Sequence, residues 1–68
     1  MILEITRLVL NETTKDDIGK PVLYKNHGWN EYGVIAGFSK LGIFVHFGMN
    51  EEPLLIRGKE LYFVTFKQ

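Results

Sequence analysis

Apolar and polar positions alternate most regularly in the middle of the chain, between residues 31 and 48. The runs EYGVIAGF and IFVHFG are rich in β-branched and aromatic residues, and the short polar turn SKLG joins them. Two such runs joined by a turn predict a long β-hairpin. In the second run, Ile43, Val45 and Phe47 are expected to point to one face of the sheet. Phe44 and His46 are expected to point to the other face.

Two glycines interrupt the first strand of this hairpin. Gly33 and Gly37 lie inside a strand pattern, where glycine is typical of a bulge, a sharp bend or the close approach of another backbone. Small barrels need such bends in order to close. The first hairpin strand is therefore predicted to bend.

Shorter strand patterns flank the hairpin. PVLYK at 21–25 precedes it, followed by the loop NHGWN at 26–30, and LLIR at 54–57 and LYFVTF at 61–66 come after it. Five short strands with a turn between each pair predict a small closed all-β structure. Its predicted core consists of Val22, Ile35, Phe38, Val45, Ile56, Leu61 and Phe63.

Residues 1–10, MILEITRLVL, fit either a strand or a helix. Their isoleucine, valine and threonine content favours the strand. A strand that is apolar on both faces must be covered, or it will pair with another chain. Homo-oligomerisation through residues 1–10 therefore stays open as an alternative.

A polar segment at 11–19 follows. Thr14 is placed as a helix N-cap, Asp16 and Asp17 suit a first helical turn, and Gly19 would end that turn. We expect a single helical or 3₁₀ turn. The alternative, a paired-carboxylate site at Asp16 and Asp17, is disfavoured because no histidine or third acid lies nearby in the sequence.

Length and charge limit the possible functions. A chain of 68 residues predicts one small domain, and without cysteine neither disulfides nor thiolate-bound zinc can reinforce its core. The formal net charge of zero counts against nucleic-acid binding by phosphate neutralisation, although it leaves room for a local basic patch. Residues 1–10 are too short and too charged to span a membrane and lack signal-peptide features. We therefore expect a soluble, cytoplasmic protein without a membrane partner.

The run from Ile18 to Phe63 resembles an SH3-like or Tudor-like small β-barrel. The resemblance rests on IGKPVLY, EYGVIAGF, GIFVHFG and the turn GKEL before the last strand. The same run resembles small phage and prophage proteins of uncharacterised role, with the order G-x-x-V-x-Y, a polar loop with His-Gly, G-V-I and F-V-x-[YF]-G. The resemblance implies a single SH3-like domain over residues 1–68. Its five-stranded barrel covers about residues 18–66, with a short helical turn and residues 1–13 as an N-terminal extension.

Tudor-like barrels often bind ligands with aromatic residues that rim the open end of the barrel. The resemblance implies a partner-binding rim that consists of Tyr24, His27, Trp29, Tyr32, Phe47 and Asn50. Glu31 or Glu51 would supply the acidic neighbour that a cationic ligand requires. Two structural alternatives stay open: Trp29 as a lid that completes the core, and Phe47 as a core residue.

The sequence offers no catalytic constellation and no metal-binding spacing. It has no nucleophile paired with a base and no phosphate-cradling glycine loop, and His27 and His46 lack a third ligand. We therefore predict a non-enzymatic module without a cofactor or metal. The first hypothesis is a protein-interaction module, an adaptor or phage accessory factor. The alternative is a nucleic-acid-associated module in which the same aromatics stack on bases and Lys25, Lys40 and Arg57 contact phosphates.

Overall fold

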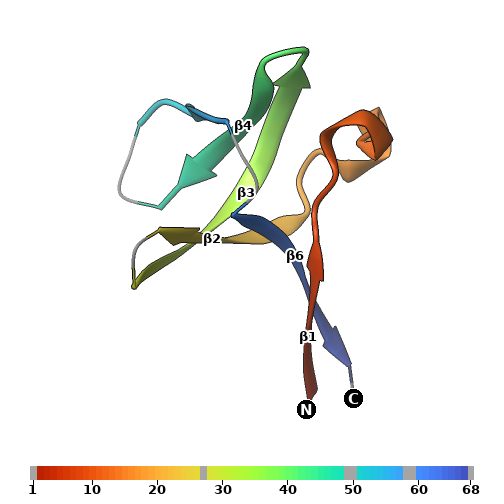
Figure 1. Ribbon diagram of the computed structural model, residues 1–68, viewed down its shortest axis with the longest axis vertical. Helices are drawn as coiled ribbons and strands as arrows, with labels where there is room; N and C mark the ends of the chain where they lie inside the picture. The colour runs from red at the N-terminus through yellow and green to blue at the C-terminus, as the bar shows by residue number, and fades with distance from the viewer. Residues whose placement is uncertain (1, 27, 49–50, 58–59, 68) are drawn as a thin grey trace.

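The chain folds into one antiparallel β-sheet (Figure 1). The structure is a computed structural model that describes residues 2–26, 28–48, 51–57 and 60–67. Its strands are β1 (Ile2–Arg7), β2 (Pro21–Asn26), β3 (Trp29–Ser39), β4 (Gly42–Phe47), β5 (Leu54–Ile56) and β6 (Leu61–Lys67). Two 3₁₀ helices, η1 (Leu10–Glu12) and η2 (Lys15–Asp17), lie between β1 and β2. In the described part of the chain, no helix is long and apolar enough to cross a membrane.

The all-β prediction is confirmed, whereas the closed five-stranded barrel is not. Six strands pair in the order β1-β6-β2-β3-β4-β5, and over the described residues the two end strands do not pair with each other. The sixth strand is β1, which confirms the strand preference over Ile2–Arg7, whereas Leu10 already belongs to η1. It pairs with β6 from Ile2↔Lys67 to Arg7↔Tyr62. Because β6 then has a neighbour on each edge, closure would need pairing between β1 and the three-residue β5.

The β1–β6 pair forms a ribbon that extends past the rest of the sheet, with both ends of the chain side by side (Figure 1). The pairing between β2 and β6 covers only Val22↔Phe63 to Tyr24↔Leu61. Pro21 opens β2 and has no N–H to donate, which limits this ladder at its start. The last residues of β6 therefore pair on one edge only within the described residues.

The β3–β4 hairpin contains the irregularity that its glycines predicted. The register shifts between Ile35 and Gly37, which identifies a bulge in β3. Gly33 serves the other predicted purpose, because a Cβ atom on it would lie 2.8 Å from the carbonyl oxygen of His46. Only a residue without a side chain lets the two backbones approach this closely.

The core lies on one face of the sheet, which we call the inner face. Its most deeply buried side chains are Phe47, Ile35, Val22 and Val45. Ile43, Leu61 and Leu8 complete the buried cluster, and Leu10, Tyr24, Ile56 and Phe63 pack against it while partly exposed. The prediction of Phe38 as a core residue is wrong, since 37% of it is exposed. Its register partner is Ile43 on the inner face, but Phe38 lies near the tip of the hairpin, beyond most of the core.

The predicted helical turn is confirmed as η2. The Thr14 N–H donates to Oδ2 of Asp17 at 3.0 Å, and Nζ of Lys20 donates to Oδ1 of the same carboxylate at 2.8 Å. The Gly19 N–H donates to the Ile35 carbonyl at 2.8 Å, and the Ile35 N–H donates to the Lys20 carbonyl at 3.0 Å. These two backbone bonds tie the turn to the centre of β3.

Candidate interaction surface

The described residues of the predicted rim are divided between the core and the surface. Phe47 is 2% exposed and belongs to the core, the alternative that strand alternation had left open. Tyr24 is half-buried and its ring centroid lies 6.2 Å from that of Phe47. Trp29 pairs with Asn26 at the start of β3 and is 67% exposed, so it is not a lid over the core.

Tyr32 lies on the opposite face of the sheet from Tyr24. The register pairs Tyr24 with Glu31 and Leu23 with Tyr32, and successive residues of a strand point to opposite faces. Glu31 therefore shares a face with Tyr24, whereas Tyr32 points to the outer face, away from the core. His27 and Asn50, the other two predicted rim residues, lie outside the described residues. The described rim residues therefore provide no common aromatic cage.

The outer face carries a group of exposed hydrophobic residues that we call the outer apolar patch. It consists of Leu3, Ile5, Tyr32, Val34 and Phe66. The register places it in two parts: Leu3 pairs with Phe66 and Ile5 follows on β1, whereas Tyr32 and Val34 lie on β3, with β2 between β6 and β3. Tyr32 and Phe66 are the most exposed, at 57% and 59%.

Two buried residues lie beneath this patch. Leu23 and Val64 are almost fully buried, yet neither belongs to the core cluster on the inner face. Strand alternation places both on the outer face, where Leu23 pairs with Tyr32 and Val64 pairs with Ile5. The outer face therefore has a small hydrophobic cluster of its own, with exposed apolar side chains around it.

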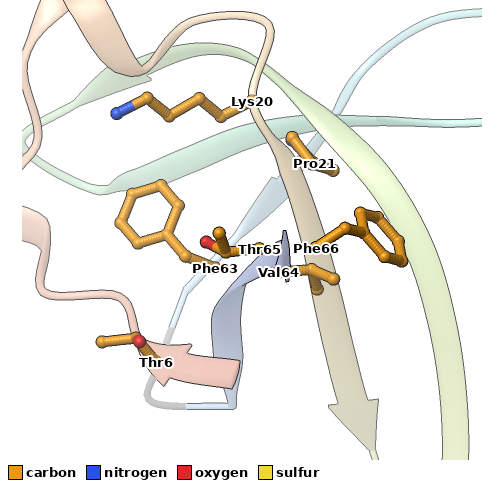
Figure 2. Close-up of a pocket in the computed structure, with 7 residues that line it drawn as sticks. All are labelled: Thr6, Lys20, Pro21, Phe63, Val64, Thr65 and Phe66. Atoms are coloured by element: carbon orange, nitrogen blue, oxygen red, sulfur yellow. The ribbon is translucent and has the colours of Figure 1, made fainter. Parts of the chain in front are cut away.

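A pocket of about 560 Å³ borders the patch where β2 begins (Figure 2). It is lined by Thr6, Lys20, Pro21, Phe63, Val64, Thr65 and Phe66. Figure 2 shows the Lys20 side chain extended above the Phe63 ring, with its Nζ 5.7 Å from the ring centroid. The pocket lies beside β6 where that strand runs past the start of β2. Its mainly apolar lining therefore lies next to a stretch of β6 that does not pair with β2.

At the other end of the outer face, two cations lie over one tyrosine ring. The guanidinium carbon of Arg7 is 5.8 Å from the centroid of Tyr62, and Nζ of Lys25 is 5.2 Å from it. Neither cation forms an ion pair with any described residue. The salt bridge found among the described residues joins Lys20 to Asp17. Arg7, Lys25, Tyr62 and the neighbouring Tyr32 are called the cation–tyrosine site below.

The structure separates Lys25 from the other two predicted phosphate contacts, Lys40 and Arg57. Lys25 lies near the end of β2 and pairs with Asn30 at the start of β3. Lys40 comes directly after Ser39, the last residue of β3. Arg57 follows Ile56, which pairs with Ile43 at the Lys40 end of the hairpin. Sequence reasoning missed Arg7 and Tyr62, because nothing in the local pattern indicates that β6 lies between β1 and β2.

No family model, curated protein or solved structure matches this chain in comparisons with known proteins. Among the described residues, no three histidine, cysteine, aspartate or glutamate side chains form a group that could hold a metal ion.

Proposed function

We propose that this protein is a non-enzymatic interaction module that binds a protein partner on the outer face of its sheet. The proposal rests on the outer apolar patch, whose five side chains are exposed on the same side of the sheet. Removing apolar surface from water is favourable, and contiguous exposed patches on small proteins mark interaction sites. Tyrosine is a frequent anchor at such interfaces, which gives Tyr32 a central place.

The proposed partner is a protein, as expected from the sequence, but the proposed contact residues differ from the predicted rim. Tyr32 remains a contact residue, whereas Trp29 is exposed on the same strand but by strand alternation points to the opposite face from Tyr32. Tyr24 and Phe47 are no longer proposed as contact residues, because Tyr24 packs against the core and Phe47 belongs to it. His27 and Asn50 stay predictions from the sequence.

We also propose that the SH3-like resemblance holds for the chain from β2 to β6. Strands β2, β3, β4 and β6 occupy the segments that carry the resemblance, and the bulge in β3 supplies the bend expected of the second barrel strand. The addition of β1 beside β6 gives an opened variant of that arrangement. A phage or prophage origin and a cytoplasmic location stay predictions from the sequence.

Site-specific crosslinking in cells tests the proposed interface. A photoreactive amino acid replaces Phe66 in the patch, and the matched control replaces Leu41, an equally exposed hydrophobic residue in the β3–β4 turn. We expect a defined protein crosslinked from position 66 and not from position 41. The same products from both positions, or none from position 66, contradict the proposal.

Binding of the identified partner then measures the contribution of the patch. Phe66→Ser should raise the dissociation constant about fivefold or more, because truncating an interface anchor costs more than about 1 kcal/mol. Leu41→Ser should leave the constant unchanged. If the crosslinked partner is a second copy of the chain, the interface is the homo-oligomer that residues 1–10 left open.

A further inference from the structure

The cation–tyrosine site is built by four strands that lie side by side. Arg7 on β1 pairs with Tyr62 on β6, which pairs with Leu23 on β2. Leu23 in turn pairs with Tyr32 on β3. Neighbouring strands lie about 4.8 Å apart, so this row extends roughly 14 Å across the outer face. Leu23 is 3% exposed, whereas Tyr32 is 57% exposed and Tyr62 is half-buried.

The two cations of this site are held by an aromatic ring rather than by a carboxylate. Because both lie within 6 Å of the Tyr62 centroid, their charged groups lie within about 11 Å of each other. An aromatic ring attracts a cation to its face without using the N–H donors of that cation, so these donors stay available to an anion. The acid nearest in register is Glu60, whose carbonyl accepts the Lys25 N–H at 2.9 Å.

We propose that the cation–tyrosine site binds single-stranded nucleic acid. Proteins bind single strands by combining positive charge along the backbone with aromatic rings on which the bases stack. Here Arg7 and Lys25 meet two phosphates, and the exposed ring of Tyr32 receives a base. Since the net charge is zero, long-range attraction is weak and binding depends on these two local cations.

The cation–tyrosine site and the proposed protein interface can be tested separately, because most of their residues differ. Arg7 and Lys25 do not belong to the outer apolar patch, and Phe66 and Leu3 do not belong to the cation–tyrosine site. Tyr32 is shared. Loss of one activity with retention of the other is therefore measurable, and the failure of one proposal leaves the other standing.

Fluorescence anisotropy with short labelled oligothymidylate and oligouridylate tests the proposal. Each phosphate neutralised on a single strand contributes about −0.7 to the slope of log K against log salt concentration. Two contacts predict a slope of about −1.4, or a roughly sevenfold weaker affinity on going from about 50 mM to about 200 mM salt. The two oligonucleotides distinguish DNA from RNA as the preferred ligand.

Variants assign the binding to individual side chains. Arg7→Gln and Lys25→Gln should each weaken binding and halve the salt slope, whereas Arg7→Lys should retain the slope. Tyr32→Leu should weaken binding about fivefold or more with the salt slope unchanged, because it removes base stacking. The matched controls are Lys40→Gln, a contact predicted from the sequence, and Lys15→Gln in η2. Both should behave like the parent protein.

Several results would overturn the proposal. One is the absence of binding at about 50 mM salt, where electrostatic association is strongest. Another is unchanged binding by the Arg7→Gln or Lys25→Gln variant, each first shown to be folded by its NMR spectrum. A polyglutamate peptide of matched charge that competes as well as the oligonucleotide would instead identify an acidic protein as the ligand.

Discussion

Gly33 lies directly opposite Phe47 across the β3–β4 ladder, and a Cβ atom on Gly33 would be 3.0 Å from Cδ1 of the Phe47 ring. The same atom would be 2.7 Å from Cγ1 of Val45 and 2.8 Å from the carbonyl oxygen of His46. The side chains can rotate, but the carbonyl oxygen belongs to the paired strand and cannot. This glycine therefore sets the spacing of the two strands over the core.

Gly33→Ala should lower the free energy of unfolding by about 1–3 kcal/mol, because the methyl group overpacks the core. Gly37→Ala on the same strand is the matched control, since its Cβ would meet its nearest atom, Cδ2 of Phe44, at 4.0 Å. We expect the control to leave stability unchanged or to raise it by up to about 1 kcal/mol. Urea unfolding followed by circular dichroism measures both. Equal effects at the two positions would contradict the close approach at Gly33.

Truncation of two phenylalanines should have unequal effects. Phe47→Ala should cost about 3–5 kcal/mol, since Phe47 is 2% exposed at the centre of the core. A chain of this size has a total stability of roughly 3–10 kcal/mol, so this variant should be unfolded or close to it. Phe38→Ala should cost no more than about 2 kcal/mol because Phe38 is 37% exposed. Urea midpoints test the order, and similar losses for both would contradict it.

The two phenylalanines also indicate how far the sequence alone determines this fold. Alternation along β4 predicts that Phe47 shares the buried face of Ile43 and Val45, and it does. Alternation predicts which face a residue points to, but not what lies over that face. Phe38 faces inward opposite Ile43 but lines an open pocket with Leu10, Asn11 and Thr13, and no local pattern predicts that arrangement.

The candidate surface was less predictable than the strands. The bulge in β3 and the turn at η2 follow from glycines and capping residues that are close in sequence. The pairing of Arg7 with Tyr62 joins residues near opposite ends of the chain, and it depends on β6 lying between β1 and β2. Such long-range order depends on burial summed over the whole sheet. The sequence therefore predicted exposed aromatics without predicting which of them share a face.

Acid should destabilise the protein in part through Asp17. The hydrogen bond from Lys20 is the largest cause that lowers the pKa of this carboxyl below its ordinary value of 3.8, and the Thr14 N–H adds to it. Because the pKa is lower in the folded state, the carboxylate stabilises the fold above about pH 3.8. That stabilisation is lost as the pH falls through the folded-state pKa.

Asp17→Asn should therefore lower stability at neutral pH, and the difference from the parent protein should shrink as the pH falls through the acid range. Asp16→Asn is the matched control, because Asp16 makes no hydrogen bond or ion pair with the described residues. Urea midpoints measured from neutral pH into strong acid check the prediction, and NMR titration reports the Asp17 pKa directly. An Asp17→Asn difference that stays constant with pH would contradict it.

Trp29 gives a direct test of the exposed end of β3, because it is the single tryptophan in the chain. With 67% of the residue exposed, its fluorescence should resemble that of free tryptophan in water, and iodide should quench it efficiently in the folded protein. Trp29→Ala should change the free energy of unfolding by no more than about 0.5 kcal/mol, whereas a lid over the core would lose about 3–5 kcal/mol. A blue-shifted emission that unfolding moves to longer wavelength would support the lid. Because that lid would bury the ring, it would also remove Trp29 from the surface available to a partner.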